Sequence, residues 1–336
     1  MQNSIIVADV KLPLRQQDPE TAGGIVSPFL TLVQRVPLPA PACRVRSMPQ
    51  NTRITAVAML GGGGVSLMRR ASYSERVIQD PEECMNLAQI TPLEGYEGKQ
   101  ATFGLCWDPH KTGRLLAAGV DGAMCMWDVA RTSVVVSTMS KEDPSMSRET
   151  GPARVLSTLS GEPVLDACFH PKLADLAGIV RGGKVALWDT RGGFNEISDS
   201  GARLNSLSFC PTQEQYFVTG GSDGKVCIWD TRNTREPQRR LSWHHGEVLQ
   251  VEWSPCMEGI ISSTAQDRRV FVWDTTRAGR PQTAEDRAEG PPELVFIHGG
   301  HTALVTDMAW NPHDPLTMAS VASDNILQIW QPASTP

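Results

Sequence analysis

The sequence has little that is typical of membrane, secreted or metal-binding proteins. No apolar run approaches the roughly 18 residues that a membrane span needs. The N-terminus has no basic stretch followed by an apolar one, so we predict no secretory signal. None of the eight cysteines forms a CxxC pair, which argues against zinc and thioredoxin-type sites and predicts reduced thiols in the cytosol or nucleus. Basic pairs such as Arg69–Arg70 are too short for a DNA-binding patch or a convincing nuclear signal.

Signals for catalysis are also missing. The glycine run Gly61–Gly64 precedes neither a helix nor a lysine, so it does not resemble a phosphate-binding loop. No metal-ligand spacing and no unrepeated pair of nucleophile and base is present. We therefore predict a protein that is not an enzyme and has no cofactor, metal or small-molecule substrate.

The composition is that of a globular chain that buries a core. Of 336 residues, 40% are hydrophobic and 20% are charged, and the net charge is −6. This charge disfavours DNA and anionic membranes as direct partners and favours a basic partner. Tyrosine is rare, with 3 residues, whereas tryptophan occurs 9 times. The tryptophans recur in a pattern.

Five segments end in a tryptophan with apolar neighbours, and each has an aromatic residue 19 or 20 positions upstream in a strand-like context followed by a proline turn. The intervals between units vary, while the spacing inside a unit is nearly constant, as expected for rigid units joined by variable loops. Alternation of period two predicts strands within each unit. The five aromatic–tryptophan pairs are Trp107–Trp127, Phe169–Trp188, Phe209–Trp229, Trp253–Trp273 and Trp310–Trp330.

Polar residues recur within the units as well. An aspartate lies six residues before the tryptophan in four units, a serine or threonine lies ten before it in three, and a histidine lies further upstream in two. This pattern resembles the WD40 repeat, whose buried His–Ser–Trp–Asp hydrogen-bond network fastens a propeller blade. Two units carry all four members, namely His245, Ser263, Asp267 and Trp273, and His301, Ser320, Asp324 and Trp330.

A catalytic triad is the rival interpretation of these histidines, serines and aspartates. Repetition argues against it, because a triad occurs once. The repeated cysteines, such as Cys106 and Cys168 before the core aromatics, are assigned to packing for the same reason. The unit at Trp188 has Gly178 and Gly182 at the serine and aspartate positions, so we expect its blade to be less tightly fastened.

The repeats predict an all-β fold, a single seven-bladed WD40 β-propeller over residues 1–336. Residues 1–40 form an incomplete first blade, with strands at Ser4–Pro13 and Phe29–Leu38. Residues 41–98 form a degenerate blade with a long polar insert at 71–98. Residues 99–336 hold the five clear repeats and a second polar insert at 138–153.

Longer segments resemble one WD40 family, the retinoblastoma-associated histone-binding proteins that form the small subunit of chromatin assembly factor and of deacetylase and polycomb complexes. The resemblance covers most of the chain and is dense after Asn205. The proline pair followed by FIHGGH is its most specific part. The matching segments are Asn3–Pro13, Arg44–Asn51, His245–Pro255, Gln266–Asp274 and Glu289–Gln331.

This resemblance implies two histone-binding surfaces. The first holds a histone H4 helix between an N-terminal helix and an acidic proline-pair loop. The loop is present, although Arg287 and Ala288 interrupt its acidic run, and the N-terminal helix is absent. Without the resemblance, a solvated connection would be the simpler interpretation of such a loop. The loop residues are Glu285, Asp286, Glu289, Gly290, Pro291, Pro292, Glu293 and Leu294.

The second implied surface is the acidic mouth of the channel, which takes a basic tail such as that of histone H3. Here only Asn205 and Glu247 match the family, and Cys43, Phe103 and Leu249 also depart from it. We expect weak or altered tail binding, because lost carboxylates remove Coulomb attraction. Acidic positions of the family are occupied by Pro41, Ala101, Leu165, Gly182 and Ser323.

The resemblance also implies that the leading helix, the closing strand and the first strands of blade one are missing. Three explanations are a gene model that starts late, a strand donated by a partner chain, or a rearrangement of Ile5–Val10 and Phe29–Leu38 that seals the ring.

The function that the resemblance implies is a nuclear, non-catalytic scaffold that binds histones H3–H4 and other subunits of chromatin complexes. The alternative is a propeller adaptor outside chromatin, such as a ubiquitin-ligase substrate receptor or a peroxisomal cargo receptor.

Overall fold

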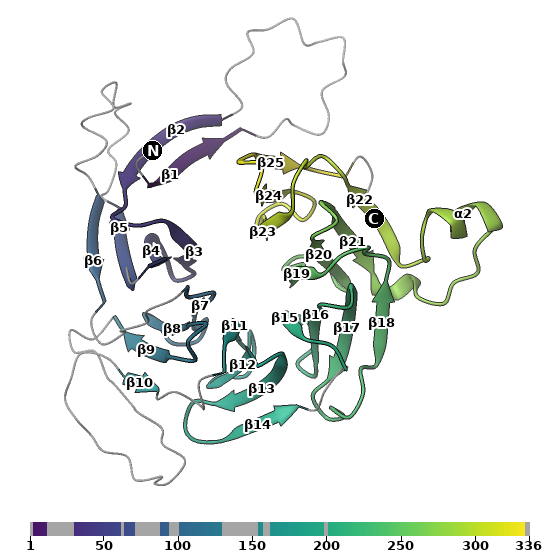
Figure 1. Cartoon of the computed structure of the whole chain (residues 1–336), viewed down its shortest axis with the longest axis horizontal. Helices are drawn as coiled ribbons and strands as arrows, with labels where there is room; N and C mark the ends of the chain where they lie inside the picture. Colours follow the sequence, from purple (N-terminus) through teal and green to yellow (C-terminus); the bar gives the residue numbers. More distant parts are fainter. Residues whose placement is uncertain are drawn as a thin grey trace, which may run out of the picture.

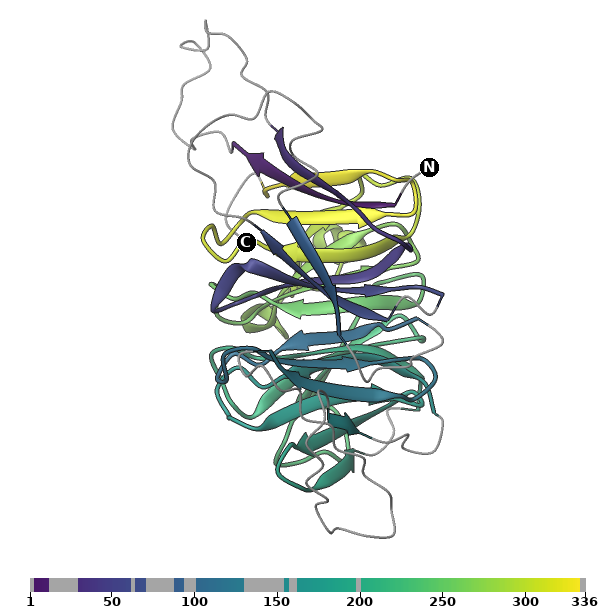
Figure 2. The same cartoon turned by 90° about the vertical axis from the view of Figure 1, so that its left-hand side faces the viewer.

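A computed structural model describes residues 3–11, 30–61, 64–70, 88–93, 101–129, 154–156, 162–197 and 201–332. These residues form six blades around a central channel and one additional two-stranded sheet, and Figure 1 views the ring along the channel. Figure 2 shows the ring from its side, as a disc of stacked blades. The prediction of an all-β propeller is therefore confirmed. The repeats predict seven blades with the first one incomplete, whereas the described residues form six blades and a two-stranded hairpin.

The two-stranded sheet is a hairpin of β1 (Ser4–Val10) and β2 (Leu30–Pro37), close to the two strands expected for an incomplete first blade. In Figure 1 it follows the outer side of the ring, beside the blade that comes next in the chain. A small core holds it there, made by Val36, Leu38, Val57, Met59 and Met68.

Each of the six blades is an antiparallel meander whose first strand lies nearest the channel (Figure 1). The first three blades consist of β3 (Ala42–Met48), β4 (Asn51–Met59), β5 (Val65–Arg70) and β6 (Ala88–Pro92); of β7 (Gly104–Trp107), β8 (Arg114–Ala118), β9 (Met124–Asp128) and β10 (Arg154–Leu156); and of β11 (Val164–Phe169), β12 (Leu176–Arg181), β13 (Lys184–Asp189) and β14 (Phe194–Ile197).

The remaining blades follow in chain order around the ring. The last one has three strands among the described residues. They consist of β15 (Leu204–Phe209), β16 (Tyr216–Gly221), β17 (Lys225–Asp230) and β18 (Arg239–Ser242); of β19 (Val248–Trp253), β20 (Ile260–Ala265), β21 (Val270–Asp274) and β22 (Leu294–His298); and of β23 (Val305–Trp310), β24 (Met318–Ala322) and β25 (Leu327–Trp330).

Two short helical segments lie between β21 and β22, the 3-10 turn η2 (Thr275–Arg277) and the helix α2 (Ala284–Glu289). Part of the predicted polar insert at 71–98 is structured, because β6 falls inside it. The insert has few apolar residues, so its sequence did not indicate a strand. β6 forms because the edge of β5 supplies main-chain hydrogen-bond partners for it. The insert at 138–153 lies outside the described residues.

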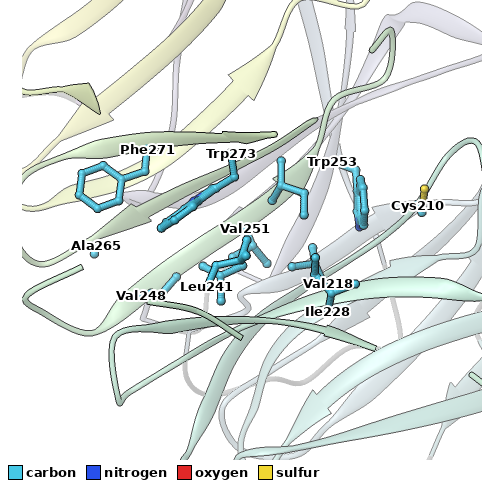
Figure 3. Close-up of a cluster of buried hydrophobic side chains, with 12 residues drawn as sticks. Cys210, Val218, Ile228, Leu241, Val248, Val251, Trp253, Ala265, Phe271 and Trp273 are labelled. Carbon is cyan, nitrogen blue, oxygen red and sulfur yellow. The ribbon is translucent and has the colours of Figure 1, made fainter. Parts of the chain in front are cut away.

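The repeated tryptophans lie on the third strand of their blades, and the upstream aromatics end the first strand. Trp127, Trp229 and Trp273 are almost fully buried. Figure 3 shows one core, in which residues of the β15–β18 blade, such as Val218 and Ile228, lie beside Val251, Trp253 and Trp273 of the next blade. The apolar cores thus lie between neighbouring blades as well as within them. Replacing one of these tryptophans with alanine is expected to cost about 3–5 kcal/mol.

The inner strands share one irregularity that sets the direction of their side chains. In five blades the pairing of the first strand with the second shifts by one residue near the start of the first strand. Side chains alternate along a strand. Two residues from different inner strands that follow the shift by the same number of positions therefore point to the same side of their strands. The residues directly after the shift are Arg44, Asp166, Ser206, Gln250 and Asp307.

The ring closes differently at one junction. Neighbouring inner strands from β3 through to β23 pack against one another in order. Between β23 and β3, Asp307 instead forms ion pairs with Arg44 and Arg46, each with an N–O distance of 3.3 Å. Two long arginine side chains therefore connect the first and last of the six blades.

Candidate functional site

The segment that follows η2 is organised as a capped helix rather than an irregular loop. Thr283 accepts a hydrogen bond from the Asp286 backbone, and the Asp286 carboxylate accepts one from the Thr283 backbone at 3.4 Å. This reciprocal capping box satisfies amide groups at the start of α2. The prediction of a loop missed this helix, although the Thr-x-x-Asp spacing is visible in the sequence.

The eight predicted loop residues divide into exposed and packed groups. Glu285, Asp286 and Glu289 are exposed on α2, which projects from the outer side of the ring in Figure 1. Gly290 is buried and has a φ of 153°. A Cβ atom at Gly290 would lie 2.8 Å from Leu294 Cδ2, so the turn requires glycine.

The proline pair and the residues after it connect α2 to the blade. Pro291, Pro292, Glu293 and Leu294 are partly buried. The Glu293 carbonyl accepts a hydrogen bond from the Asp274 amide at 2.7 Å, and Leu294 packs against the core that contains Trp273. This segment is held in one position, with its carboxylates outward and its apolar residues partly available.

The two matching residues of the channel mouth, Asn205 and Glu247, do lie together. Asn205 Nδ2 donates to Glu247 Oε1 at 3.0 Å. Arg203 pairs with the same carboxylate at 2.5 Å, and Gln266 donates to its other oxygen. Chiefly because of Arg203, the pKa of Glu247 is lowered although burial opposes this. The carboxylate is thus charged, and its charge is already compensated.

A second carboxylate lies at the start of an inner strand on this side of the ring. Glu162 precedes β11 and pairs with Arg181 at 3.1 Å, while Arg181 also reaches Glu196 at 3.3 Å. A Cβ at Gly182 would lie 2.8 Å from Glu162 Oε2. Glycine at this position therefore makes room for the glutamate. The repeat pattern alone gave no signal for Glu162.

Below the mouth, the channel contains a cavity of about 290 Å³. Its walls come from inner strands of five blades, and its charged side chains are Arg46, Asp166 and Glu252. Asp307 faces the same region through its ion pair with Arg46. These acidic residues lie deeper than the positions that define the mouth.

The carboxylates of the channel serve different contacts. Asp166 accepts hydrogen bonds from Ser206 Oγ at 2.6 Å and from the Leu207 amide at 3.1 Å in the next blade. Burial raises the pKa of Asp307, but Arg46 and Arg44 outweigh it and the net pKa is lowered. Glu252 is different. Burial raises its pKa to about 7, its carboxylate accepts from the Trp310 backbone, and its Oε2 atom is buried with no hydrogen-bond partner.

The sequence holds a signal for these three acids that is separate from the mouth positions. Asp166 and Asp307 each lie three residues before the aromatic that ends an inner strand, and Glu252 lies one before it. With alternating side chains, both offsets place the residue on the opposite side of the strand from the buried aromatic, toward the channel. The three acids are not among the predicted site residues, because the family resemblance points only to the mouth.

One blade network forms with a different histidine from the predicted one. His244, not His245, contacts Ser263 Oγ and Asp267 Oδ2, both at 2.8 Å, and Trp273 Nε1 donates to the same Ser263 oxygen at 2.8 Å. His244 stacks on Phe271, whereas His245 is exposed. Counting back from Trp273 could not separate two adjacent histidines, because the loop before β19 sets which one turns inward.

The structure brings the members of the second predicted network together. His301 Nε2 lies 2.8 Å from Ser320 Oγ, and Trp330 Nε1 donates to the same oxygen at 3.1 Å. His301 Nδ1 lies 3.4 Å from Asp324. A shorter version occurs in another blade, where Trp229 Nε1 donates to Thr219 Oγ1 at 2.9 Å. Each group fastens the strands of one blade.

The described cysteines that recur in the blades have the environments of packing residues. Burial raises the pKa of Cys125 to about 12 and that of Cys227 to about 11. Burial also raises the pKa of Cys106 and of Cys168, which line the cavity. All four thiols are therefore protonated near neutral pH and are poor nucleophiles.

Within the described ranges, no group of three histidine, cysteine or acidic residues is arranged to hold a metal ion. No helix in the described part of the chain is long and apolar enough to cross a membrane.

Comparison with protein families identifies WD40 repeats, described as "WD domain, G-beta repeat", at residues 196–230, 235–274 and 292–331. Two of these matches begin before an outer strand, β18 or β22, and end with the third strand of the next blade. Each of the two repeats therefore spans a pair of neighbouring blades and links them covalently.

Proposed function

We propose that this WD40 propeller is a nuclear, non-catalytic scaffold that binds histones H3–H4 within chromatin assembly or histone-modifying complexes of the deacetylase or polycomb type. WD40 propellers act as platforms for protein–protein contacts, which supports the scaffold role. The histone assignment rests on the family resemblance of the sequence together with the geometry of the segment from α2 to Leu294.

The observation that best supports histone binding is an acidic helix, α2, next to a partly exposed apolar turn. Glu285 and Glu289 are one helical turn apart and exposed, so they can pair with lysine and arginine side chains of a partner. Pro291 and Pro292 offer apolar surface directly beside them. An amphipathic basic helix, such as a histone H4 helix, is complementary to this combination.

Charge reversal on α2 tests this proposal. The double substitution Glu285→Lys and Glu289→Lys should weaken binding of an H3–H4 tetramer at least tenfold and reduce the salt dependence of the affinity. The matched control reverses two exposed glutamates elsewhere on the ring, Glu236→Lys and Glu258→Lys. Fluorescence anisotropy with labelled H3–H4 measures both. Equal affinities for the wild type and the α2 double variant would reject the assignment.

The channel mouth bears on a second question, the binding of the histone H3 tail. The Glu247 carboxylate pairs with Arg203 and Glu162 pairs with Arg181, so little uncompensated negative charge is available there. We expect an unmodified H3 tail peptide to bind this chain weakly. Tight, salt-sensitive binding of that peptide would contradict this expectation.

An adaptor outside chromatin is the alternative, and compensated charge at the mouth is the observation that favours it. Affinity purification of the tagged chain from its own cells separates the two functions. Recovery of H3–H4 with assembly-factor or deacetylase subunits supports the chromatin role. Recovery of ubiquitin-ligase subunits or peroxisomal cargo without histones rejects it.

A further inference from the structure

We propose that Ser242 is a phosphorylation site for a serine kinase that recognises basic residues, and that Lys225 and Arg240 bind the phosphate once it is attached. The site lies on β18, the outermost strand of its blade (Figure 1). It is separate from the α2 segment and from the channel, and it does not depend on the proposed histone function.

The first argument is the sequence around Ser242. Arg239 and Arg240 lie three and two residues before the serine, and the apolar Trp243 directly follows it. Kinases that prefer basic substrates select such serines, because carboxylates beside their active site pair with the two guanidinium groups and an apolar pocket takes the next side chain. The proposed histone contact does not use this pair of arginines.

The second argument is the exposure of the residues that a kinase must reach. Arg239, Arg240 and Ser242 are exposed, and Leu241 between them points into the core and is 1% exposed. Arg239 donates a hydrogen bond to the Thr275 carbonyl at 2.7 Å, and this contact is at the surface. A carboxylate of the kinase can therefore replace the carbonyl as its partner.

Another serine of the chain shows the opposite environment. Arg203 lies three residues before Ser206, so the sequence alone also offers this serine to a kinase. Ser206 is only 1% exposed, however, and its hydroxyl donates to Asp166 at 2.6 Å. The folded blade therefore hides Ser206 and presents Ser242.

The third argument is the backbone of β18. Kinases bind the residues around the target serine in an extended conformation, which β18 already has. In the described part of the chain β18 pairs with β17 on one side and forms the end of its sheet. Four residue pairs, the buried Leu241 and the partly buried Trp243 hold it in place. Release of such a short outer strand is among the less costly local openings of a blade.

The fourth argument is a pair of cations on the same side of the sheet as Ser242. Lys225 lies directly opposite Ser242 in the register of β17 and β18, so their side chains point to the same side. Arg240 lies two positions before Ser242 and therefore on this side too. Burial is the main cause of the raised pKa of the Cys227 thiol, and Arg240 and Lys225 both lower it, so the two cations lie near one another.

A phosphate at Ser242 would compete for a cation that already has a partner. Lys225 pairs with Asp223 at 3.0 Å, and the two side chains are 41% and 32% exposed. A phosphoserine carries nearly two negative charges at pH 7 and three strong acceptor oxygens, whereas the aspartate carries one charge. Phosphorylation should therefore add ionic contacts between the end of β18 and β17.

The reaction is a phosphoryl transfer from ATP. The γ-phosphoryl group moves to Ser242 Oγ, while the bond between the γ-phosphorus and its bridging oxygen breaks. ADP leaves, and a base of the kinase takes the proton of the serine hydroxyl.

Phosphorylation of the folded full chain tests the site. The probe is the catalytic subunit of cyclic-AMP-dependent protein kinase with ATP and Mg²⁺, and mass spectrometry of the digested chain locates the phosphate. Ser72, which lies outside the described residues, has the same spacing to Arg69 and Arg70, so the rates are measured in a Ser72→Ala background. We expect close to one phosphate per chain on Ser242.

Variants of the arginines test how the kinase recognises the strand. Arg239→Gln combined with Arg240→Gln should slow phosphorylation of Ser242 at least tenfold. The matched control is Ser222→Ala, which removes an exposed serine without preceding arginines and should leave the rate unchanged. An equal rate for the double arginine variant would overturn the proposal.

A synthetic peptide of residues 236–246 keeps the test valid without any variant. This peptide and the folded chain are compared under the same conditions. Phosphate on Ser242 in both supports the proposal. Phosphate on the peptide without phosphate on Ser242 of the folded chain overturns it, because the blade would then hide the serine.

Phosphorus NMR tests the contact between the phosphate and the two cations. The second pKa of phosphoserine is about 6 without partners, and nearby cations favour the dianion. Titration should therefore give a lower pKa in the folded phosphorylated chain than in urea. Lys225→Gln should raise this pKa, whereas Arg232→Gln, beyond the other end of β17, should not change it. Equal values in the folded and denatured chains would overturn the role of Lys225 and Arg240.

Discussion

His244 and His245 are adjacent in the sequence but have opposite roles in the structure. The His244 ring bridges Ser263 and Asp267. Burial raises the pKa of Asp267, but the contacts with His244 outweigh it and the net pKa is lowered. His245 contributes its backbone amide to Asp267 at 3.1 Å, while its side chain remains exposed. At the scale of single residues, one position along the chain separates a buried network member from a surface residue.

We predict that His244→Ala lowers the free energy of unfolding by about 2–3 kcal/mol, because it leaves buried polar groups unsatisfied. His245→Ala keeps the backbone contact and should change it by less than about 0.5 kcal/mol. Urea denaturation followed by tryptophan fluorescence measures both variants. Similar losses for the two variants would contradict the assignment of His244.

The raised pKa of Glu252 predicts how the stability of the protein depends on pH. Its pKa rises from 4.5 to about 7 on folding, so the folded protein holds a proton that the unfolded chain has lost between these values. Stability from this group is therefore fully present below pH 4.5 and is lost as the pH rises through about 7, by roughly 3 kcal/mol.

Glu252→Gln removes this dependence. Relative to wild type, the variant should gain about 3 kcal/mol of stability between about pH 4.5 and about pH 8. Chemical denaturation at a series of pH values measures it, with Glu236→Gln as the control that follows wild type. A constant difference between Glu252→Gln and wild type across this range would show that the pKa of Glu252 is not raised.

At the scale of elements, the contact between β12 and β15 depends on a glycine. A Cβ at Gly178 would lie 2.5 Å from Leu207 Cδ1 and 3.0 Å from Phe209 Cζ in the next blade. The repeat pattern predicts a less tightly fastened blade because Gly178 replaces a serine. The weaker fastening stays a prediction, and the structure adds a separate reason for the glycine, since Leu207 and Phe209 occupy the space that a serine side chain would need.

Gly178→Ser should therefore destabilise the protein by about 1–3 kcal/mol, although it restores the residue of the repeat pattern. Leu207→Ala alone creates a cavity and is also destabilising. The double variant should be more stable than the sum of the two losses predicts, because the alanine makes room for the serine. Thermal denaturation of the four proteins measures this coupling. Strictly additive losses would contradict direct contact between the two sites.

At the scale of the whole molecule, the ring depends on one ion-paired junction. Five junctions pack inner strand against inner strand, whereas Arg44 and Arg46 reach Asp307 between β3 and β23. Arg44 is 10% exposed and Asp307 29%, so this cluster is only partly screened by solvent. The hairpin of β1 and β2 packs on the outer side of the blade that follows it.

We predict that Asp307→Asn costs about 2 kcal/mol, because two partly buried arginines lose their counter-charge. Hydrogen exchange should increase most in β3 and β23, where the ring opens. Lys225→Gln breaks an exposed ion pair with Asp223 and should cost less than about 0.5 kcal/mol. If hydrogen exchange in Asp307→Asn instead increased equally in all blades, Asp307 would not act specifically at the junction between β3 and β23.

The sequence by itself determined the all-β propeller and the strands that carry its aromatics. The spacing inside the repeats is constant because each repeat consists of three consecutive strands linked by tight turns. This arrangement is local, so it is visible in the order of the residues. It also located the acidic segment Glu285–Glu293, because composition and turn residues are visible without a structure.

Only the tertiary structure decided which histidine enters a blade network, that α2 is a capped helix, and that Glu252 lies in the channel with a carboxylate oxygen unpaired. These features depend on side-chain direction and on partners distant in the chain. Asp307 and Arg46, which are separated by 261 positions, meet because the ring closes. Closure brings together residues that no local pattern connects, and it places three carboxylates and two arginines in one channel.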